Sequence, residues 1–245
     1  MIDFSVERGV ARIALDSPHN RNALSSALMT ELEQRLAEAG RDDDVRAVEL
    51  THTGGTFCAG ADLTEARAGG MAEGTKRVIA LLRQIVELPK PVVASIDGHV
   101  RAGGMGLLGA CDIALAGPAS SFAFSEVRLG LAPAMISLTT LPRLTPRAAS
   151  RYYLTGETFD APTAARIGLI TESVEDIDAA THAVLDALRK ASPQGLRETK
   201  PLTTRAVLFD DADALAEQSA RLFASDEARE GMTSFLEKRP PRWAQ

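Results

Sequence analysis

The first residues of the chain alternate between apolar and polar side chains. The alternation covers residues 2–7 and 10–16, and Arg8-Gly9 separates the two segments. A period of two is typical of a strand with one buried face. Two such strands joined by a short polar turn predict an antiparallel hairpin.

A helical period replaces this alternation further along the chain. Leucines at positions 28, 32 and 36 lie on one stripe, and Ser25 precedes them in the position of a helix cap. We therefore predict a helix from Ser25 to about residue 39. A second apolar stripe predicts a helix over 73–88, which ends at the following Pro-Lys-Pro sequence.

Apolar runs at 45–51 and 91–96 predict buried strands, and a glycine-rich segment follows each run. A short apolar helix is predicted over 103–110, with two more short strands at 112–116 and 121–123. Strand and helix therefore alternate, which indicates an α/β fold of ββα repeats with a mixed, largely parallel sheet.

The last part of the chain, from Ser137 onward, is almost entirely helical in pattern. One strand, at 169–174, is expected among these helices. The predicted helices cover 146–154, 161–167, 176–190, 196–209, 212–224 and 226–237.

Composition limits the classes of function. The chain has 245 residues, of which 45% are hydrophobic, so it can bury one large core. Its net charge of −6 argues against nucleic acid or an anionic membrane as the main partner. No apolar run is long enough to cross a bilayer and no signal peptide is present, so we expect a cytoplasmic protein. The four histidines lack metal-ligand spacing, and the two cysteines, Cys58 and Cys111, are too few for a disulfide framework.

Two glycine-rich segments and one later glutamate carry the candidate chemistry. The segments are 54–63 and 97–107, and the glutamate is Glu126. Small residues let a ligand approach the backbone closely. Two such loops side by side could aim two peptide N–H groups at one oxygen, and so stabilise an enolate or a tetrahedral anion.

The order and spacing of these segments resemble the crotonase superfamily, also called the enoyl-CoA hydratase/isomerase family. The resemblance implies a crotonase-like spiral of ββα repeats over 1–190. It also implies a C-terminal helical trimerisation region over 191–245, which packs on the core or on a neighbouring subunit. A homotrimer or a dimer of trimers is therefore expected, and a plain helical subdomain is the alternative. The matching motifs are 21–24, the two glycine-rich segments, Cys111-Asp112, 125–130, 154–156, 164–169 and 235–239.

The same resemblance implies three catalytic positions. The backbone N–H groups of Ala61 and Gly103 would hold a thioester oxygen, and Glu126 would carry the proton. Hydratases of the family use a second glutamate, and that position falls on Gly106 in this chain. A tight strand-to-helix turn is the alternative reason for a glycine at position 103.

The surroundings of Glu126 leave two interpretations open. A pocket of Phe122, Phe124 and Leu129 would raise the pKa of its carboxyl by desolvation and suit general acid–base catalysis. Alternatively, Glu126 is a surface residue in the first turn of a short helix. Two arginines lie near this pocket, Arg101 and Arg128. Either could pair with the glutamate or bind an acidic acyl group, although we favour solvent-facing side chains.

Coenzyme A would enter as part of the thioester substrate, so no separate cofactor and no metal are expected. By resemblance, the residues that would contact it are Arg21, Asn22, Ala23, Ala59, Asp62, Leu63, Phe235 and Lys238. Asp62 could instead cap the helix that follows it. Lys238 could instead oppose the dipole at the C-terminus of a helix.

The leading prediction is therefore an enoyl-CoA hydratase, a lyase that adds water in syn fashion to a 2-enoyl-CoA. A 3,2-enoyl-CoA isomerase is the first alternative, because one carboxylate can move a proton from C2 to C4 while the oxyanion hole holds the dienolate. A non-catalytic acyl-CoA-binding protein is the second alternative, because a carboxylate is missing at Gly106. In each case the expected partner is an acyl-CoA thioester.

Overall fold

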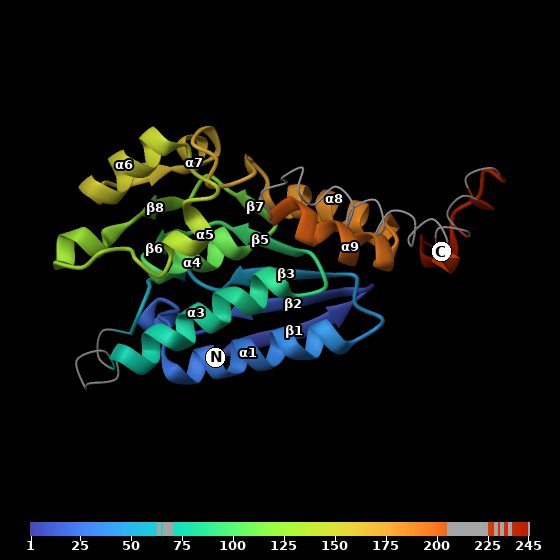
Figure 1. Ribbon diagram of the computed structural model, residues 1–245, viewed down its shortest axis with the longest axis horizontal. Helices are drawn as coiled ribbons and strands as arrows, with labels where there is room; N and C mark the ends of the chain where they lie inside the picture. The colour runs from blue at the N-terminus through green and yellow to red at the C-terminus, as the bar shows by residue number, and fades with distance from the viewer. Residues whose placement is uncertain are drawn as a thin grey trace, which may run out of the picture.

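Two β-sheets form the centre of the molecule, and helices cover them (Figure 1). The computed structural model describes residues 1–62, 65, 71–204, 225–227, 230, 233–234 and 237–244. Within these residues, one sheet has the strand order β1-β2-β3-β5-β7-β10, and the other has the order β4-β6-β8-β9. The fold is the mixed α/β class that the alternation of strands and helices predicts.

The six-stranded sheet begins with the predicted hairpin. β1 and β2 pair antiparallel, and the turn between them places Gly9 at a φ of 76°. The remaining neighbours in this sheet pair in parallel. The strands are β1 (Ile2–Glu7), β2 (Val10–Leu15), β3 (Ala47–His52), β5 (Val92–Ile96), β7 (Ile113–Ala116) and β10 (Glu172–Ser173).

The strand predicted at 169–174 is shorter in the structure, where β10 covers only two residues. The N–H groups of Leu169 and Ile170 both donate to the carbonyl of Ala164, at 2.9 and 3.4 Å. These two amides complete the end of the preceding helix. They are therefore not available to a neighbouring strand.

The four-stranded sheet contains three strands that the sequence analysis missed, two inside the glycine-rich segments and one of two residues at 159–160. A strand of three residues is too short to show a period of two. β6 pairs in parallel with both β4 and β8, and β8 pairs antiparallel with β9. The strands are β4 (Thr56–Cys58), β6 (His99–Arg101), β8 (Ser121–Ala123) and β9 (Phe159–Asp160).

This arrangement confirms the expected ββα repeat. β3 and β4 precede α3 (Met71–Glu87), and β5 and β6 precede α4 (Gly103–Ala110). The first strand of each pair joins the six-stranded sheet and the second joins the four-stranded sheet. Each turn of the chain therefore adds one strand to each sheet.

The other helices follow the predicted pattern. The Oγ of Ser25 caps α1 by accepting a hydrogen bond from Leu28 N at 3.2 Å. The predicted helix at 212–224, the end of the one at 196–209 and much of the one at 226–237 lie outside the described residues. The remaining elements are α1 (Ser26–Arg41), α5 (Ser137–Thr140), α6 (Pro146–Thr155), α7 (Ala161–Arg166), α8 (Ile177–Lys190), α9 (Pro193–Thr204) and the 3-10 helices η1 (Pro18–Asn20), η2 (Ser125–Leu129) and η4 (Arg242–Ala244).

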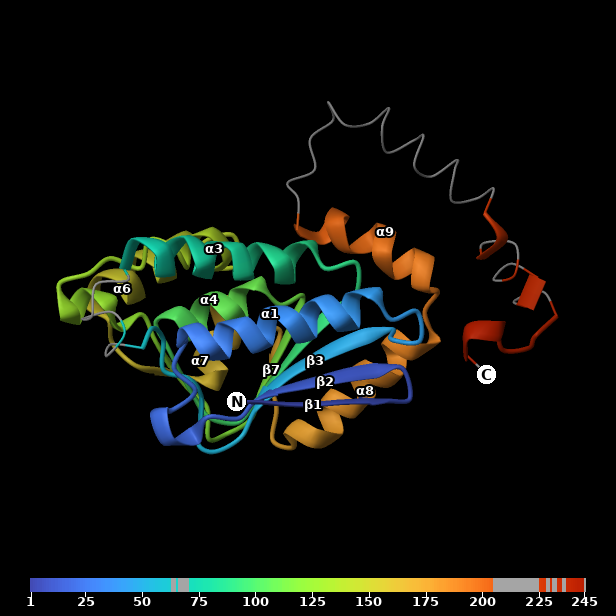
Figure 2. The same cartoon turned by 90° about the horizontal axis from the view of Figure 1, so that it is seen from below.

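Apolar side chains form a core on each face of the six-stranded sheet. The larger core lies under α1 and α3 and includes the fully buried Leu28, Leu50 and Ile85. The smaller core lies under α8, where Leu185 is buried together with Val93. Figure 2 shows α1 and α8 on opposite sides of β1, β2 and β3. Among the described residues, no helix is both long enough and apolar enough to cross a membrane.

A buried lysine fixes α9 to the rest of the molecule. Lys200 is only 5% exposed, and its Nζ lies 2.9 Å from Oδ2 of Asp112. The same Nζ donates to the carbonyls of Ile85 and Lys90, at 2.9 and 3.0 Å. The first helix beyond position 190 is thus attached to the core, and its role in trimerisation stays a prediction.

Candidate active site

The candidate site lies where three parallel strands of the four-stranded sheet end. Ala61 follows β4, Gly103 follows β6 and Glu126 follows β8. β6 is the middle strand and pairs with both neighbours. Because the carboxyl ends of adjacent parallel strands meet at one edge of a sheet, the three predicted catalytic positions are brought together there.

The two glycine-rich loops contact each other through their main chains. A Cβ on Gly60 would lie 2.8 Å from the Cβ of Ala102 and 3.2 Å from Gly103 N, and Gly60 has a φ of 96°. Only glycine fits this position without strain. Since the carbonyl carbon of Gly60 is bonded to the nitrogen of Ala61, the amides of Ala61 and Gly103 lie close together. Gly103 is also the first residue of α4, where the helix N-terminus carries partial positive charge.

Both amides are available to a ligand. The N–H groups of Ala61 and Gly103 have no acceptor in the described part of the chain. The first amides of a helix have no partner inside the helix, which explains the unused donor of Gly103. Two adjacent free donors are what an oxyanion hole requires.

The side chain of Asn22 organises the chain around the first loop. It is fully buried, and its Oδ1 accepts a hydrogen bond from Ser17 N at 2.6 Å. Its amide donates to the carbonyls of Thr53 and Thr56, at 3.2 and 2.7 Å. The side chain of Asn22 thus holds the backbone around the first loop, and contact of Asn22 with coenzyme A stays a prediction.

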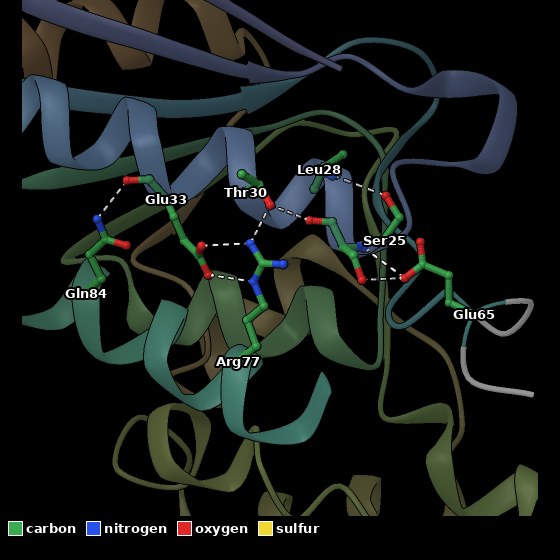
Figure 3. A network of polar contacts seen from close by, with 8 residues as sticks. Ser25, Leu28, Thr30, Glu33, Glu65, Arg77 and Gln84 are labelled. Carbon is green, nitrogen blue, oxygen red and sulfur yellow. Dashed lines mark hydrogen bonds and ion pairs between the residues drawn. The ribbon is translucent and has the colours of Figure 1, made fainter. Parts of the chain in front are cut away.

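A polar network braces the helices beside the first loop (Figure 3). Arg77 on α3 donates to both carboxyl oxygens of Glu33 on α1, at 3.1 and 2.8 Å, and to the Oγ1 of Thr30. Glu65 accepts hydrogen bonds from the N–H and Oγ of Ser26, at 2.9 and 2.8 Å. The start of α1 thus holds the side chain of Glu65, which follows the first loop.

The carboxyl group of Glu126 is half-buried at the start of η2. Its Oε2 is shielded from solvent and has no hydrogen-bond partner among the described residues. Burial raises the pKa of this carboxyl, and a main-chain hydrogen bond lowers it in part. Phe122 and Phe124 are fully buried, whereas Leu129 is 59% exposed and forms no wall. Apart from Leu129, this is the desolvated environment predicted for a general acid–base.

Neither nearby arginine neutralises Glu126. The guanidinium of Arg101 donates to the carbonyls of Val100 and Ser121, at 2.9 and 2.6 Å, and burial lowers its pKa. Arg101 is therefore half-buried, which is less exposed than the solvent-facing side chain that was predicted. Arg128 is exposed as predicted, and its Nε lies 3.4 Å from the carbonyl oxygen of Thr155.

Gly106 is enclosed by apolar side chains. A Cβ there would lie 2.7 Å from the Cγ2 of Ile136 and 3.3 Å from the Cδ1 of Leu82. Ile136 is 1% exposed, so it fills the space where a longer side chain would have to go. No second acidic side chain of the described residues acts on the pKa of Glu126. Among the described residues, the candidate site therefore has one carboxyl group.

The cysteine in the first loop is a packing residue. Cys58 is fully buried, and burial raises the pKa of its thiol to about 12. A thiol with so high a pKa is protonated at neutral pH, which excludes a thiolate nucleophile here. Among the described residues, no group of acidic, histidine and cysteine side chains could hold a metal ion.

Comparison with known proteins identifies the family. The sequence model described as enoyl-CoA hydratase/isomerase matches residues 5–245. The chain belongs to the enoyl-CoA hydratase/isomerase family. The short-chain-enoyl-CoA hydratase of Clostridium acetobutylicum is 31% identical to it over 243 residues, which cover 95% of this chain and 93% of that protein.

Solved structures with the fold of this family support the same assignment. An enoyl-CoA hydratase from Shewanella pealeana is 33% identical and superimposes with a TM-score of 0.93, over 99% of this chain and 95% of that chain. An enoyl-CoA hydratase from Mycobacterium avium is 59% identical, with a TM-score of 0.79 over 99% of this chain and 98% of that one. These matches confirm the predicted crotonase-like fold.

Several residues that the family resemblance assigns to coenzyme A lie around the first loop. The N–H of Ala59 donates to the carbonyl of Arg21 at 3.1 Å, and the side chain of Arg21 is exposed. Ala23 is 7% exposed and lies in the same turn. Asp62 caps the following chain as the alternative predicted, because its Oδ1 accepts a hydrogen bond from Glu65 N at 3.3 Å. Contact of these residues with a nucleotide stays a prediction.

Two of the other predicted contacts, Leu63 and Phe235, lie outside the described residues. Lys238 is exposed and has a φ of 54°, so it stands in a turn. Its neighbour Arg239 pairs with Glu230 at 2.7 Å.

Sequence reasoning missed two residues that bear on the site. Ile136 closes the space beside Gly106, and Tyr153 on α6 stacks against Phe124 with ring centroids 4.3 Å apart. For Ile136 the sequence offers only an apolar run at 134–136, which does not by itself indicate a site. Nothing in the pattern of α6 distinguishes Tyr153 from a core residue.

Proposed function

We propose that this protein is an enoyl-CoA hydratase, which adds water across the double bond of a 2-enoyl-CoA thioester. The observation that carries the proposal is the meeting of three strand ends, which puts Ala61, Gly103 and Glu126 at one edge of the four-stranded sheet. The names of the related hydratases support the same activity.

Each group has a defined task in this reaction. The amides of Ala61 and Gly103 donate to the thioester oxygen, which draws electron density from the double bond. The carboxylate of Glu126 takes one proton from a water molecule as the water oxygen bonds to the β-carbon. The two amides hold the resulting enolate. Glu126 then returns the proton to the α-carbon on the same face, so that it finishes as a carboxylate.

The environment of Glu126 supports this cycle. Because burial raises its pKa, the carboxyl accepts a proton more readily than an exposed glutamate does. The free amides of Ala61 and Gly103 need no reorganisation to bind the oxygen. Coenzyme A enters as part of the substrate, with the exposed Arg21 as the candidate contact for its phosphates.

A 3,2-enoyl-CoA isomerase is the second candidate, and the packing around Gly106 favours it. Since Ile136 and Leu82 fill this space, the site has one acid–base group, and moving a proton between C2 and C4 requires only one. The same loops would hold the dienolate.

Two substrates separate these functions. We expect purified protein to consume crotonyl-CoA with loss of the enoyl chromophore and formation of 3-hydroxybutanoyl-CoA. An isomerase would instead convert a 3-enoyl-CoA to the conjugated 2-enoyl-CoA and form no hydroxyacyl product. Binding of acyl-CoA without turnover of either substrate would contradict both and indicate a non-catalytic binding protein. Light scattering on the same preparation tests the expected trimer or pair of trimers.

A further inference from the structure

Tyr153 lies directly behind the strand end that carries Glu126. Its ring stacks on Phe124, two residues before the glutamate, with centroids 4.3 Å apart. The end of α6 also packs on η2, because a Cβ on Gly156 would lie 3.1 Å from both Phe124 O and the Cγ2 of Val127. Tyr153 and Glu126 therefore belong to two elements in close contact.

A chain of hydrogen bonds orients the hydroxyl of Tyr153. The Oγ1 of Thr140 is 2.7 Å from the carbonyl oxygen of Ile136, to which it donates its one proton. The Tyr153 hydroxyl is 2.5 Å from the same Oγ1, so Tyr153 must be the donor in that pair. Tyr153 thus donates its hydroxyl proton to Thr140. Its phenol oxygen can still accept a hydrogen bond through its lone pairs.

This chain of hydrogen bonds ends at Ile136, the residue whose side chain lies against Gly106. Ile136 accepts from Thr140 through its main chain, and its side chain fills the space beside Gly106. Thr140 is fully buried, whereas Tyr153 is only half-buried. Burial raises the pKa of Tyr153, the hydrogen bond with Thr140 lowers it in part, and the charge of Glu126 raises it further, so that the net shift is upward and the phenol stays neutral.

A water molecule held through both of its hydrogens is better oriented toward the β-carbon than one held by a single hydrogen bond. Glu126 can accept one of them, and Gly106 supplies no carboxylate for the other. We propose that the Tyr153 hydroxyl, oriented by Thr140, is the second acceptor, so that the substrate water is held between Glu126 and Tyr153. This inference rests on the proposed hydratase function.

The proton balance assigns different fates to the two hydrogens of the water. The hydrogen bonded to Glu126 moves to the carboxylate as the water oxygen bonds to the β-carbon, and then moves on to the α-carbon. The hydrogen bonded to Tyr153 stays on oxygen and becomes that of the product hydroxyl group. Tyr153 neither gains nor loses a proton and acts as a positioning residue.

The first test compares Tyr153→Phe with Tyr152→Phe. Tyr152 is the matched control, because it lies on the same helix and stacks on Phe159, 4.2 Å away. We expect Tyr153→Phe to lower kcat for hydration of crotonyl-CoA by about 10²-fold with KM little changed. Tyr152→Phe should match wild type. Exchange of the α-hydrogens of butanoyl-CoA with deuterated water needs Glu126 and the amides but no attacking water, so Tyr153→Phe should retain it.

Replacement of Thr140 tests the orientation of the phenol. Thr140→Val should lower hydration by about tenfold, and Thr140→Ser, which keeps the hydroxyl, should restore it. Hydration by Tyr153→Phe equal to that by Tyr152→Phe would overturn the inference while the hydratase function stands. Parallel loss of hydration and α-hydrogen exchange would also overturn it, because Tyr153 would then be supporting the position of Glu126. Absence of hydration by wild-type protein would instead remove the proposed function itself.

Discussion

Asp112 and Glu126 both bury a carboxyl oxygen, and their surroundings differ. Oδ2 of Asp112 lies 2.9 Å from Nζ of Lys200 and accepts a hydrogen bond from Val92 N at 2.7 Å. Oε2 of Glu126 has no partner in the described residues, and burial raises the pKa of this carboxyl. Oδ1 of Asp112 is also unpartnered, so the difference lies in the cation and the amide that hold its second oxygen.

The difference separates a structural carboxyl, that of Asp112, from the carboxyl of Glu126, for which we propose a role in catalysis. Asp112 joins the start of β5 to α9, and its contacts fix the positions of both. Oε2 of Glu126 has no hydrogen-bond partner in the part of the chain that the structure describes, and burying an unpaired carboxyl costs folding free energy. A group that destabilises the fold, at the meeting point of three strands and two free amides, is best explained by a role with substrate.

The largest effect should come from Glu126→Gln. We expect kcat/KM for hydration to fall by about 10²- to 10⁴-fold, because the amide cannot carry the proton. Crotonyl-CoA turnover measures the loss, and Glu175→Gln, at an exposed glutamate, is the control. Full activity in Glu126→Gln would mean that Glu126 does not carry the proton in hydration.

Gly60→Ala extends the comparison from the carboxyl to the amides. The added Cβ would meet the Cβ of Ala102 at 2.8 Å and Gly103 N at 3.2 Å, at a φ of 96°. Since the two donors must move apart, we expect kcat to fall by about 10²- to 10³-fold. Gly55→Ala adds a Cβ with no heavy atom within 4 Å in the same segment and should leave turnover unchanged. Equal kinetics for the two variants would argue against an oxyanion hole formed by these loops.

Lys200→Met should remove the ion pair of Asp112 and leave Glu126 unaffected. It leaves the Asp112 carboxyl buried without a cation, which should cost about 3 kcal/mol of unfolding free energy. Denaturant unfolding measures this loss, and Lys76→Met, on the exposed face of α3, is the control. kcat measured below the unfolding transition should stay near wild type. A Lys200→Met protein of unchanged stability would refute the structural assignment.

The smallest effect concerns the dependence of stability on pH. The folded-state pKa of Glu126 lies above its ordinary value of 4.5. Protonation of this carboxyl therefore stabilises the folded state, and this stabilisation is fully present below pH 4.5. It is lost as pH rises through the raised folded-state pKa. Glu126→Gln has no such loss. We therefore expect its unfolding free energy to exceed that of wild type at neutral pH and to converge with it in acid, in a series of denaturation curves.

Local pattern and resemblance predicted much of the fold. The hairpin, α1 and α4 follow from alternation, a leucine stripe and an apolar run, and the structure places α4 over Gly103–Ala110 as expected. β4 and β6 were missed because three residues show no period, and only pairing across the sheet defines them. The strand at 169–174 was overestimated because Leu169 and Ile170 turn their amides back to a helix.

Site residues could be predicted where a single segment of the sequence identifies them. They could not be predicted where only tertiary packing brings them to the site. The glycines of the two loops and Glu126 stand out in the sequence, and the structure brings them together. The buried side chain of Asn22 forms hydrogen bonds with Ser17, Thr53 and Thr56. No local pattern in the sequence predicts these contacts. Tyr153 reaches the site through the packing of α6 on η2, which only the tertiary structure shows.

A crystal structure with an unreactive acyl-CoA thioester tests the central claim most directly. The account predicts the thioester oxygen at about 2.7–3.1 Å from the nitrogens of both Ala61 and Gly103. It also predicts the Glu126 carboxyl next to the α- and β-carbons. A thioester bound elsewhere, or with its oxygen out of reach of either amide, would contradict it.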